Sequence, residues 1–103
     1  MPSVDLACDP EHPAFAGHFP GRPLVPGVLL LDWAQHAVES ATGLVLEGVA
    51  AAKFLSPALP DDALTVVYEV DAQAVRFEVR FEVRCGARAV ASGRFLAANP
   101  SVP

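Results

Sequence analysis

The chain has 103 residues, of which 52% are hydrophobic and 18% are charged, and its formal net charge is −5. This length predicts one domain over residues 1–103, and a core this small favours self-association. The acidic balance argues against nucleic-acid binding, because phosphate contacts need a basic surface. No apolar run reaches the roughly eighteen residues of a membrane span, and the start of the chain lacks a secretory-signal pattern. Two isolated cysteines, Cys8 and Cys85, have no metal-type spacing, so we expect a cytoplasmic protein in a reducing compartment.

A proline-rich stretch dominates the first quarter of the chain, where six of the ten prolines precede Gly27. Each proline removes a backbone donor and biases the residue before it toward extended geometry. A long ordered loop is therefore predicted over residues 9–26, with room for a short strand before it at 4–8. Loops of this length in compact domains are often functional. This loop is expected to pack down through its apolar residues, which are Phe15, Phe19, Leu24 and Val25.

One helix is predicted to begin at Gly27, because Pro26 suits a first turn and residues 28–41 contain neither proline nor glycine. Apolar side chains cover nearly its whole circumference, which predicts burial on all sides. Gly43 is the expected stop. Asp32 is the only charged residue in the first three turns.

The pattern then changes to strands, which are predicted over residues 45–54, 64–70, 75–84 and 89–97. Over residues 75–84 the apolar residues are odd and the charged ones even, as in a half-buried antiparallel strand. One buried helix followed by several antiparallel strands predicts an α+β domain whose sheet wraps the helix. The charged residues of this strand are expected to form cross-strand pairs on a solvated face, a docking surface being the alternative: Arg76, Glu78, Arg80, Glu82 and Arg84.

Three groups could carry chemistry. His18 lies in the loop and Asp32 on the helix, and an imidazole with a carboxyl group is the usual pair for moving protons near neutral pH. Gly27 has no side chain, so its N–H can approach developing negative charge at a helix N-terminus. These groups suit removal of water from a 3-hydroxyacyl thioester. The alternatives are a purely structural His18 and an Asp32 that is bonded to the loop.

Residues 17–32 read Gly-His-Phe-Pro-Gly-Arg-Pro-Leu-Val-Pro-Gly-Val-Leu-Leu-Leu-Asp. This stretch closely resembles the signature of bacterial 3-hydroxyacyl-[acyl-carrier-protein] dehydratases of the hot-dog fold. Residues 53–62, Lys-Phe-Leu-Ser-Pro-Ala-Leu-Pro-Asp-Asp, are similar to a second stretch of that family. The N-terminal helix and early strand of the common enzymes are expected to be missing. In this the chain resembles short dehydratase-like proteins of polyketide-like and aryl-polyene pathways, some of which work with a homologous partner.

The resemblance implies a hot-dog subunit that forms a homodimer, or a heterodimer with a homologous subunit, with active sites at the dimer interface. By position, His18 would be the catalytic base, Asp32 the acid, and Gly27 the amide donor to the thioester oxygen. The further substrate-binding residues that it implies are Phe19, Val28, Leu31, Gln35 and Phe54.

An acyl carrier protein is the implied partner, presenting the substrate on its phosphopantetheine, with no metal and no organic cofactor. Arg22 and Lys53 are the only bases among residues 1–75, against ten acids. Because carrier proteins are acidic, these two bases are expected to help docking. The alternative is that both are ordinary solvated side chains.

Three departures from the family pattern stand out. The acid is Asp where one branch has Glu, Gln35 follows it by three residues with His36 at the usual fourth place, and Asp61 replaces a turn glycine. Two other functions stay open: a non-catalytic subunit that supports a homologous dehydratase, and an acyl thioesterase of the same fold.

Overall fold

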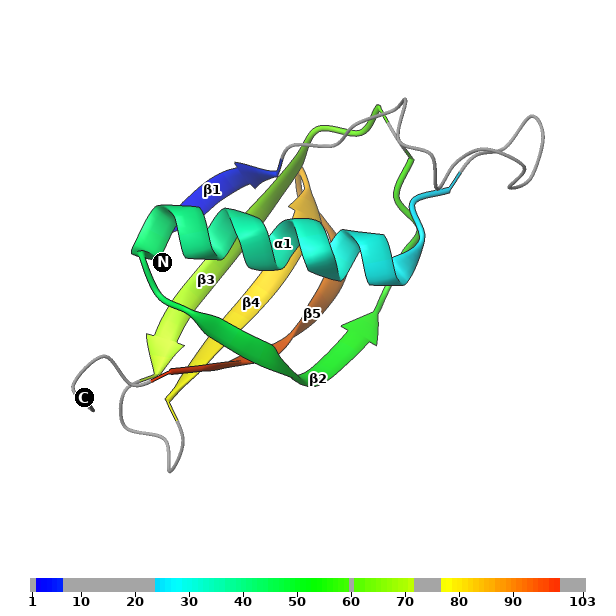
Figure 1. Cartoon of the computed structure of the whole chain (residues 1–103). Coiled ribbons are helices and arrows are strands. Elements are labelled where there is room, and N and C mark those ends of the chain that lie inside the picture. The colour runs from blue at the N-terminus through cyan, green and yellow to red at the C-terminus, as the bar shows by residue number, and fades with distance from the viewer. Residues whose placement is uncertain (1, 7–23, 60, 72–76, 99–103) are drawn as a thin grey trace.

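A five-stranded antiparallel sheet carries one helix on one of its faces (Figure 1). The computed structural model describes residues 2–6, 24–59, 61–71 and 77–98. In chain order the elements are β1 (Ser3–Leu6), α1 (Gly27–Thr42), β2 (Leu46–Phe54), β3 (Leu64–Asp71), β4 (Glu78–Cys85) and β5 (Arg88–Ala97). This arrangement confirms the predicted α+β hot-dog architecture of a helix wrapped by a sheet.

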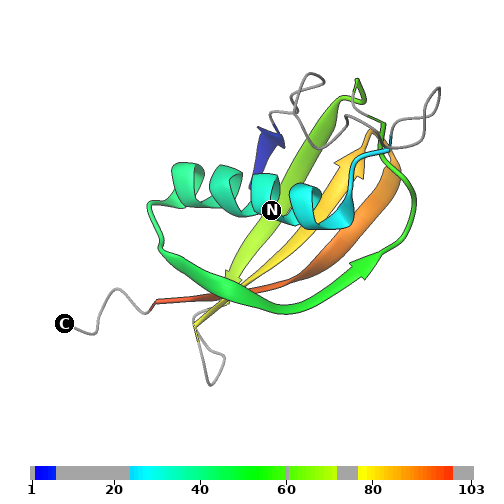
Figure 2. The ribbon, with the colours of Figure 1, turned by 45° about the vertical axis from the view of Figure 1, so that its right-hand side comes forward.

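The strand order β1-β3-β4-β5-β2 places β1 and β2 at the two edges. The pairing of β2 with β5 is interrupted by two register shifts. Such irregularities bend a strand and increase its twist, and Figure 2 shows β2 curving away from the flat part of the sheet and past α1. The curvature of β2 therefore lets the sheet wrap around α1.

Helix α1 begins and ends where the sequence predicts. Gly43 caps it in the left-handed conformation, with φ of 75°, and its N–H donates to the Glu39 carbonyl at 2.8 Å. A glycine tolerates this geometry without steric cost. At the other end Pro26 precedes the first turn, and no side chain caps it.

The prediction that the helix is buried on all sides was wrong. Its fully buried side chains are Leu30, Ala34 and Val38, which recur every four residues and face the sheet. Val28 is 83% exposed. The sheet of one chain covers only one face of a helix, so Val28 on the opposite face stays open to solvent.

The alternation predicted for the fourth strand is confirmed in β4, where Val79, Phe81 and Val83 are buried. The Phe81 ring stacks on Phe95 of β5 with centroids 4.2 Å apart. Each large apolar side chain buried in this way contributes about 1.5–3 kcal/mol relative to exposure. The buried core therefore lies between the concave face of the sheet and α1.

The outer face of the sheet carries the predicted ion pairs in part. Arg80 pairs with Glu69 across strands at 3.4 Å, and Arg94 pairs with Glu78 at 3.3 Å. Arg84 instead pairs with Glu82 along its own strand, while Arg76 lies outside the described residues. Exposed pairs of this kind contribute little to stability.

The first strand, predicted at 4–8, is observed as Ser3–Leu6, and residues 7–23, which hold most of the predicted loop, lie outside the described residues. At the end of that loop Val25 is buried as expected, whereas Leu24 is 39% exposed. The expectation that Leu24 packs down was therefore wrong, because it lies at the open rim of a cleft. Within the part of the chain that the structure describes, no helix has the length and apolarity to cross a membrane.

β5 packs tightly on β2 at Gly93, and this predicts a strong effect of a single methyl group. A Cβ at this position would lie 2.2 Å from the Ala51 carbonyl oxygen of β2, so β2 and β5 would have to separate. We expect Gly93→Ala to lower the free energy of unfolding by about 1–3 kcal/mol, measured by chemical denaturation. Ser92→Ala, on the same strand, is the matched control and should change it little. Equal midpoints for both variants would contradict the tight packing of β2 on β5.

Candidate functional site

An apolar cleft of about 650 Å³ opens at the N-terminal end of α1. It is formed by two segments that are distant in the sequence, residues 24–31 and residues 54–58. Among the described residues that line it, only Ser56 has a polar side chain. Such a cleft suits an apolar ligand that is oriented by few polar groups.

Backbone hydrogen bonds hold the two walls of the cleft together. The Val25 N–H donates to the Ala58 carbonyl at 2.8 Å, which joins the segment before the helix to the segment after β2. The N–H groups of Leu55 and Ser56 both donate to the Val90 carbonyl of β5, at 2.8 and 3.2 Å. The cleft is thus fixed by main-chain geometry at its base.

Gly27 lies where the cleft meets the helix. A Cβ on Gly27 would lie 2.7 Å from Cζ of Phe54, so the phenyl ring packs directly on the backbone of the first helical residue. The first N–H groups of a helix have no acceptor within it and carry partial positive charge. A ligand oxygen in the cleft would meet this end of the helix.

Four of the predicted site residues meet at this cleft: Gly27, Val28, Leu31 and Phe54. Their roles in binding or catalysis stay predictions. His18, Phe19 and Arg22 lie outside the described residues. Lys53 is exposed on β2, next to Phe54.

Asp32 is exposed, contrary to the prediction of a helix that is buried on all sides. Its side chain is 58% exposed, and its Oδ1 lies 3.5 Å from Nε2 of His36, one turn further along the helix. The other imidazole nitrogen lies 3.9 Å from Oε1 of Glu39. Val28, Asp32 and His36 recur every four residues and so form one exposed stripe, which we call the α1 stripe. Through Val28 this stripe begins at the cleft.

Gln35 has a structural bond in this chain. Its amide Nε2 donates to the Leu46 carbonyl at 3.4 Å, which ties the middle of α1 to the start of β2. The cleft is lined by other residues, so its predicted part in substrate binding has no direct counterpart in the geometry.

The sequence did not single out the wall at 55–58 as part of a site. Only the family-like stretch at 53–62 pointed to this region. Arg88, which contacts this wall, gave no signal at all, because it lies 32 residues after Ser56.

A helix on the concave face of a strongly curved antiparallel sheet, with an apolar cleft at the helix N-terminus, defines a hot-dog protein. The chain belongs to the ApeI-like family, described as ApeI dehydratase, whose model matches residues 2–94.

The chain is also similar to three known proteins. It is 40% identical over 70 residues to the 3-hydroxyacyl-[acyl-carrier-protein] dehydratase FabZ of Chlamydia trachomatis, a match that covers 57% of this chain and 46% of FabZ. The chain therefore spans about half the length of the curated relatives it matches. The dehydratase heterocomplex ApeI:P from Xenorhabdus doucetiae is 26% identical with a TM-score of 0.68, over 94% of this chain and 86% of that one. The fluoroacetyl-CoA thioesterase FlK, 20% identical with a TM-score of 0.68 over 93% of this chain and 82% of FlK, shares the fold.

The exposure of Asp32 predicts that it can be changed without loss of folding. An exposed ion pair of this kind contributes about 0–1 kcal/mol, so Asp32→Asn should leave the free energy of unfolding within about 0.5 kcal/mol of wild type. Leu30→Ala, on the buried face of the same helix, should cost about 2–5 kcal/mol. Denaturant titrations of both variants test this. A large loss for Asp32→Asn would contradict the exposed position of the carboxylate.

Proposed function

We propose that the chain is a dehydratase that removes water from 3-hydroxyacyl thioesters carried by an acyl carrier protein. The observation that carries this function is the apolar cleft that ends on the backbone of Gly27. An acyl chain would lie along the apolar walls, with its thioester carbonyl at the helix N-terminus. Membership of the ApeI-like family and the similarity to FabZ support the same reaction.

The reaction needs three groups, and the chain offers one for each. His18 takes the proton from the carbon next to the thioester. The N–H of Gly27 stabilises the negative charge that grows on the thioester oxygen. The Asp32 carboxyl gives a proton to the β-hydroxyl, which leaves as water while the carbon–carbon double bond forms. General acid and base groups each typically contribute about 10²–10⁴-fold in rate. No metal or organic cofactor takes part in this scheme.

We infer that the chain forms a dimer along β2 and that the second subunit completes the site. Seven of the nine residues of β2 are exposed, and its outer edge has no partner strand among the described residues. Val49, Phe54 and Leu55 add exposed apolar surface there. A second strand would satisfy the open edge, and the second subunit would bring its own groups to the α1 stripe. The partner is a second copy or a homologous subunit, as the ApeI:P heterocomplex illustrates for a relative.

The carrier protein approaches in this scheme from the side of Lys53. This side chain is exposed at the end of β2 beside the cleft, and Arg22 is the second base proposed for docking. A local positive charge of this kind attracts an acidic carrier although the whole chain is acidic. The proposed location is the cytoplasm, where carrier-bound substrates are made.

Incubation of the purified protein with a 3-hydroxyacyl carrier substrate tests the function directly. Mass spectrometry should show the loss of one water and an enoyl product. Turnover only after a homologous subunit is added would fit a heterodimer, and it would favour the non-catalytic role if it survived His18→Ala in this chain. Release of free thiol would favour a thioesterase. His18→Ala should abolish product formation, and unchanged turnover by this variant would overturn the scheme.

Crowding at Gly27 gives a second test of the cleft. The methyl group of Gly27→Ala would displace the Phe54 ring and push the substrate carbonyl away from the helix, so we expect kcat/KM to fall on the order of 10²-fold. Ser40→Ala is the control, because it changes an exposed side chain near the other end of the same helix, away from the cleft. Equal activity of the two variants would exclude a carbonyl site at Gly27.

A further inference from the structure

We propose that Arg88 is a positioning residue of the cleft: its guanidinium fixes the 55–58 wall and, through that wall, the chain that leads into Gly27. This role rests on the proposed dehydratase activity only for its effect on turnover. Its effect on the geometry of the wall stands on the contacts of Arg88 alone.

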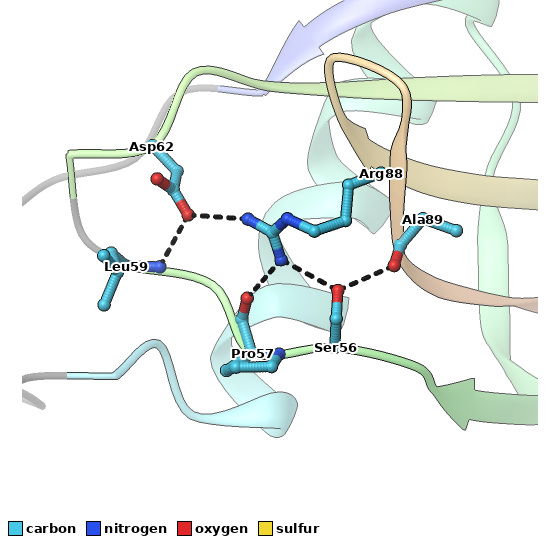
Figure 3. A network of polar contacts seen from close by, with 6 residues as sticks. All are labelled: Ser56, Pro57, Leu59, Asp62, Arg88 and Ala89. Carbon is cyan, nitrogen blue, oxygen red and sulfur yellow. Dashed lines mark hydrogen bonds and ion pairs between the residues drawn. The ribbon is translucent and has the colours of Figure 1, made fainter.

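Three acceptors converge on the Arg88 guanidinium (Figure 3). Nη1 donates to the Pro57 carbonyl at 2.7 Å and to Oγ of Ser56 at 2.8 Å, and Nη2 donates to Oδ2 of Asp62 at 3.3 Å. The planar guanidinium offers several donors in a fixed geometry, so one side chain holds three points of the segment after β2.

The contacted groups are themselves tied to the fold. Ser56 Oγ donates to the Ala89 carbonyl at 2.7 Å, and Oδ2 of Asp62 accepts the Leu59 N–H at 2.9 Å. Figure 3 shows the Ser56–Ala89 bond linking the wall to the start of β5, and the Leu59–Asp62 bond within the segment that follows the wall. The network therefore joins the β4–β5 hairpin to both ends of the segment that follows β2.

The 55–58 wall depends on these side-chain bonds because it makes few backbone hydrogen bonds of its own. The ladder between β2 and β5 ends with Phe54 opposite Ala91. Beyond it, Leu55 and Ser56 donate to a single carbonyl, that of Val90, and Pro57 has no N–H to donate. The Arg88 side chain therefore provides hydrogen bonds where the main chain makes none at Pro57.

The wall in turn reaches the helix N-terminus. Ala58, the residue after Pro57, is buried and its carbonyl accepts the Val25 N–H at 2.8 Å. Val25 stands two residues before Gly27. A shift of the Pro57 carbonyl therefore moves both the apolar side of the cleft and the segment that sets the Gly27 amide.

Arg94 is a matched control on the same strand. It pairs with Glu78 at 3.3 Å, and the exposed fractions of the two side chains are 48% and 16%, against 43% and 19% for Arg88 and Asp62. The arginine of each pair is about half-exposed, so each ion pair contributes little to global stability. Only the Arg88 pair lies against the cleft.

The experiment compares Arg88→Met and Arg94→Met, since methionine keeps an apolar stem and removes the donors. In the protein without substrate, hydrogen exchange of the Val25, Leu55 and Ser56 amides should be about tenfold faster in Arg88→Met, because local opening becomes easier. With a 3-hydroxyacyl carrier substrate, kcat/KM should fall about tenfold. Arg94→Met should stay within about twofold of wild type in both measurements.

Arg88→Lys provides the rescue test. An ammonium group can reach one of the three acceptors but cannot bridge them, so exchange and kcat/KM should lie between those of wild type and Arg88→Met. Identical behaviour of Arg88→Met and Arg94→Met would overturn the positioning role. Unfolding of both Arg88 variants would also overturn it, because Arg88 would then stabilise the whole fold and not the wall alone. If wild type shows no turnover, the dehydratase activity fails, and the exchange rates still decide whether Arg88 holds the wall.

Discussion

A sheet of one chain can cover only one face of a helix, and most of this molecule follows from that constraint. The covered face of α1 is a line of Leu30, Ala34 and Val38 against the concave side of the sheet. The opposite face keeps the exposed α1 stripe, although the helix is apolar enough to be buried throughout. This face and the open edge of β2 are the surfaces that the proposed second subunit would cover.

The curvature of the sheet determines how the sheet packs around α1. Register shifts bend β2 around the helix, and Gly93 lets β2 approach β5 closely. The chain leaves β2 beside the N-terminus of α1, so two segments distant in the sequence become the two walls of one cleft. The Val25–Ala58 hydrogen bond closes that arrangement at its base.

Polar side chains are distributed unevenly over this structure. The described lining of the cleft is apolar apart from Ser56, whereas ion pairs occupy the outer face of β3, β4 and β5. The network around Arg88 lies between these regions, at the point where the regular ladder ends. Side-chain donors there replace the main-chain bonds that a proline cannot make.

The sequence by itself determined the elements, because local backbone sterics and side-chain periodicity act over a few residues. The stop of α1 at Gly43 and the alternation of Val79, Phe81 and Val83 were both predictable for this reason. The motif at 17–32 also indicated the fold and family before any coordinates. His18 of this motif lies outside the described part of the chain, so its predicted role still rests on the sequence alone.

Only the tertiary structure decided which faces are covered. The exposure of Asp32, the structural bond of Gln35 and the wall at 55–58 depend on how far one sheet reaches around one helix. Arg88 joins a segment some thirty residues earlier in the chain, and no local pattern records such a contact. Periodicity reports which side chains share a face, whereas burial depends on what the rest of the chain brings against that face.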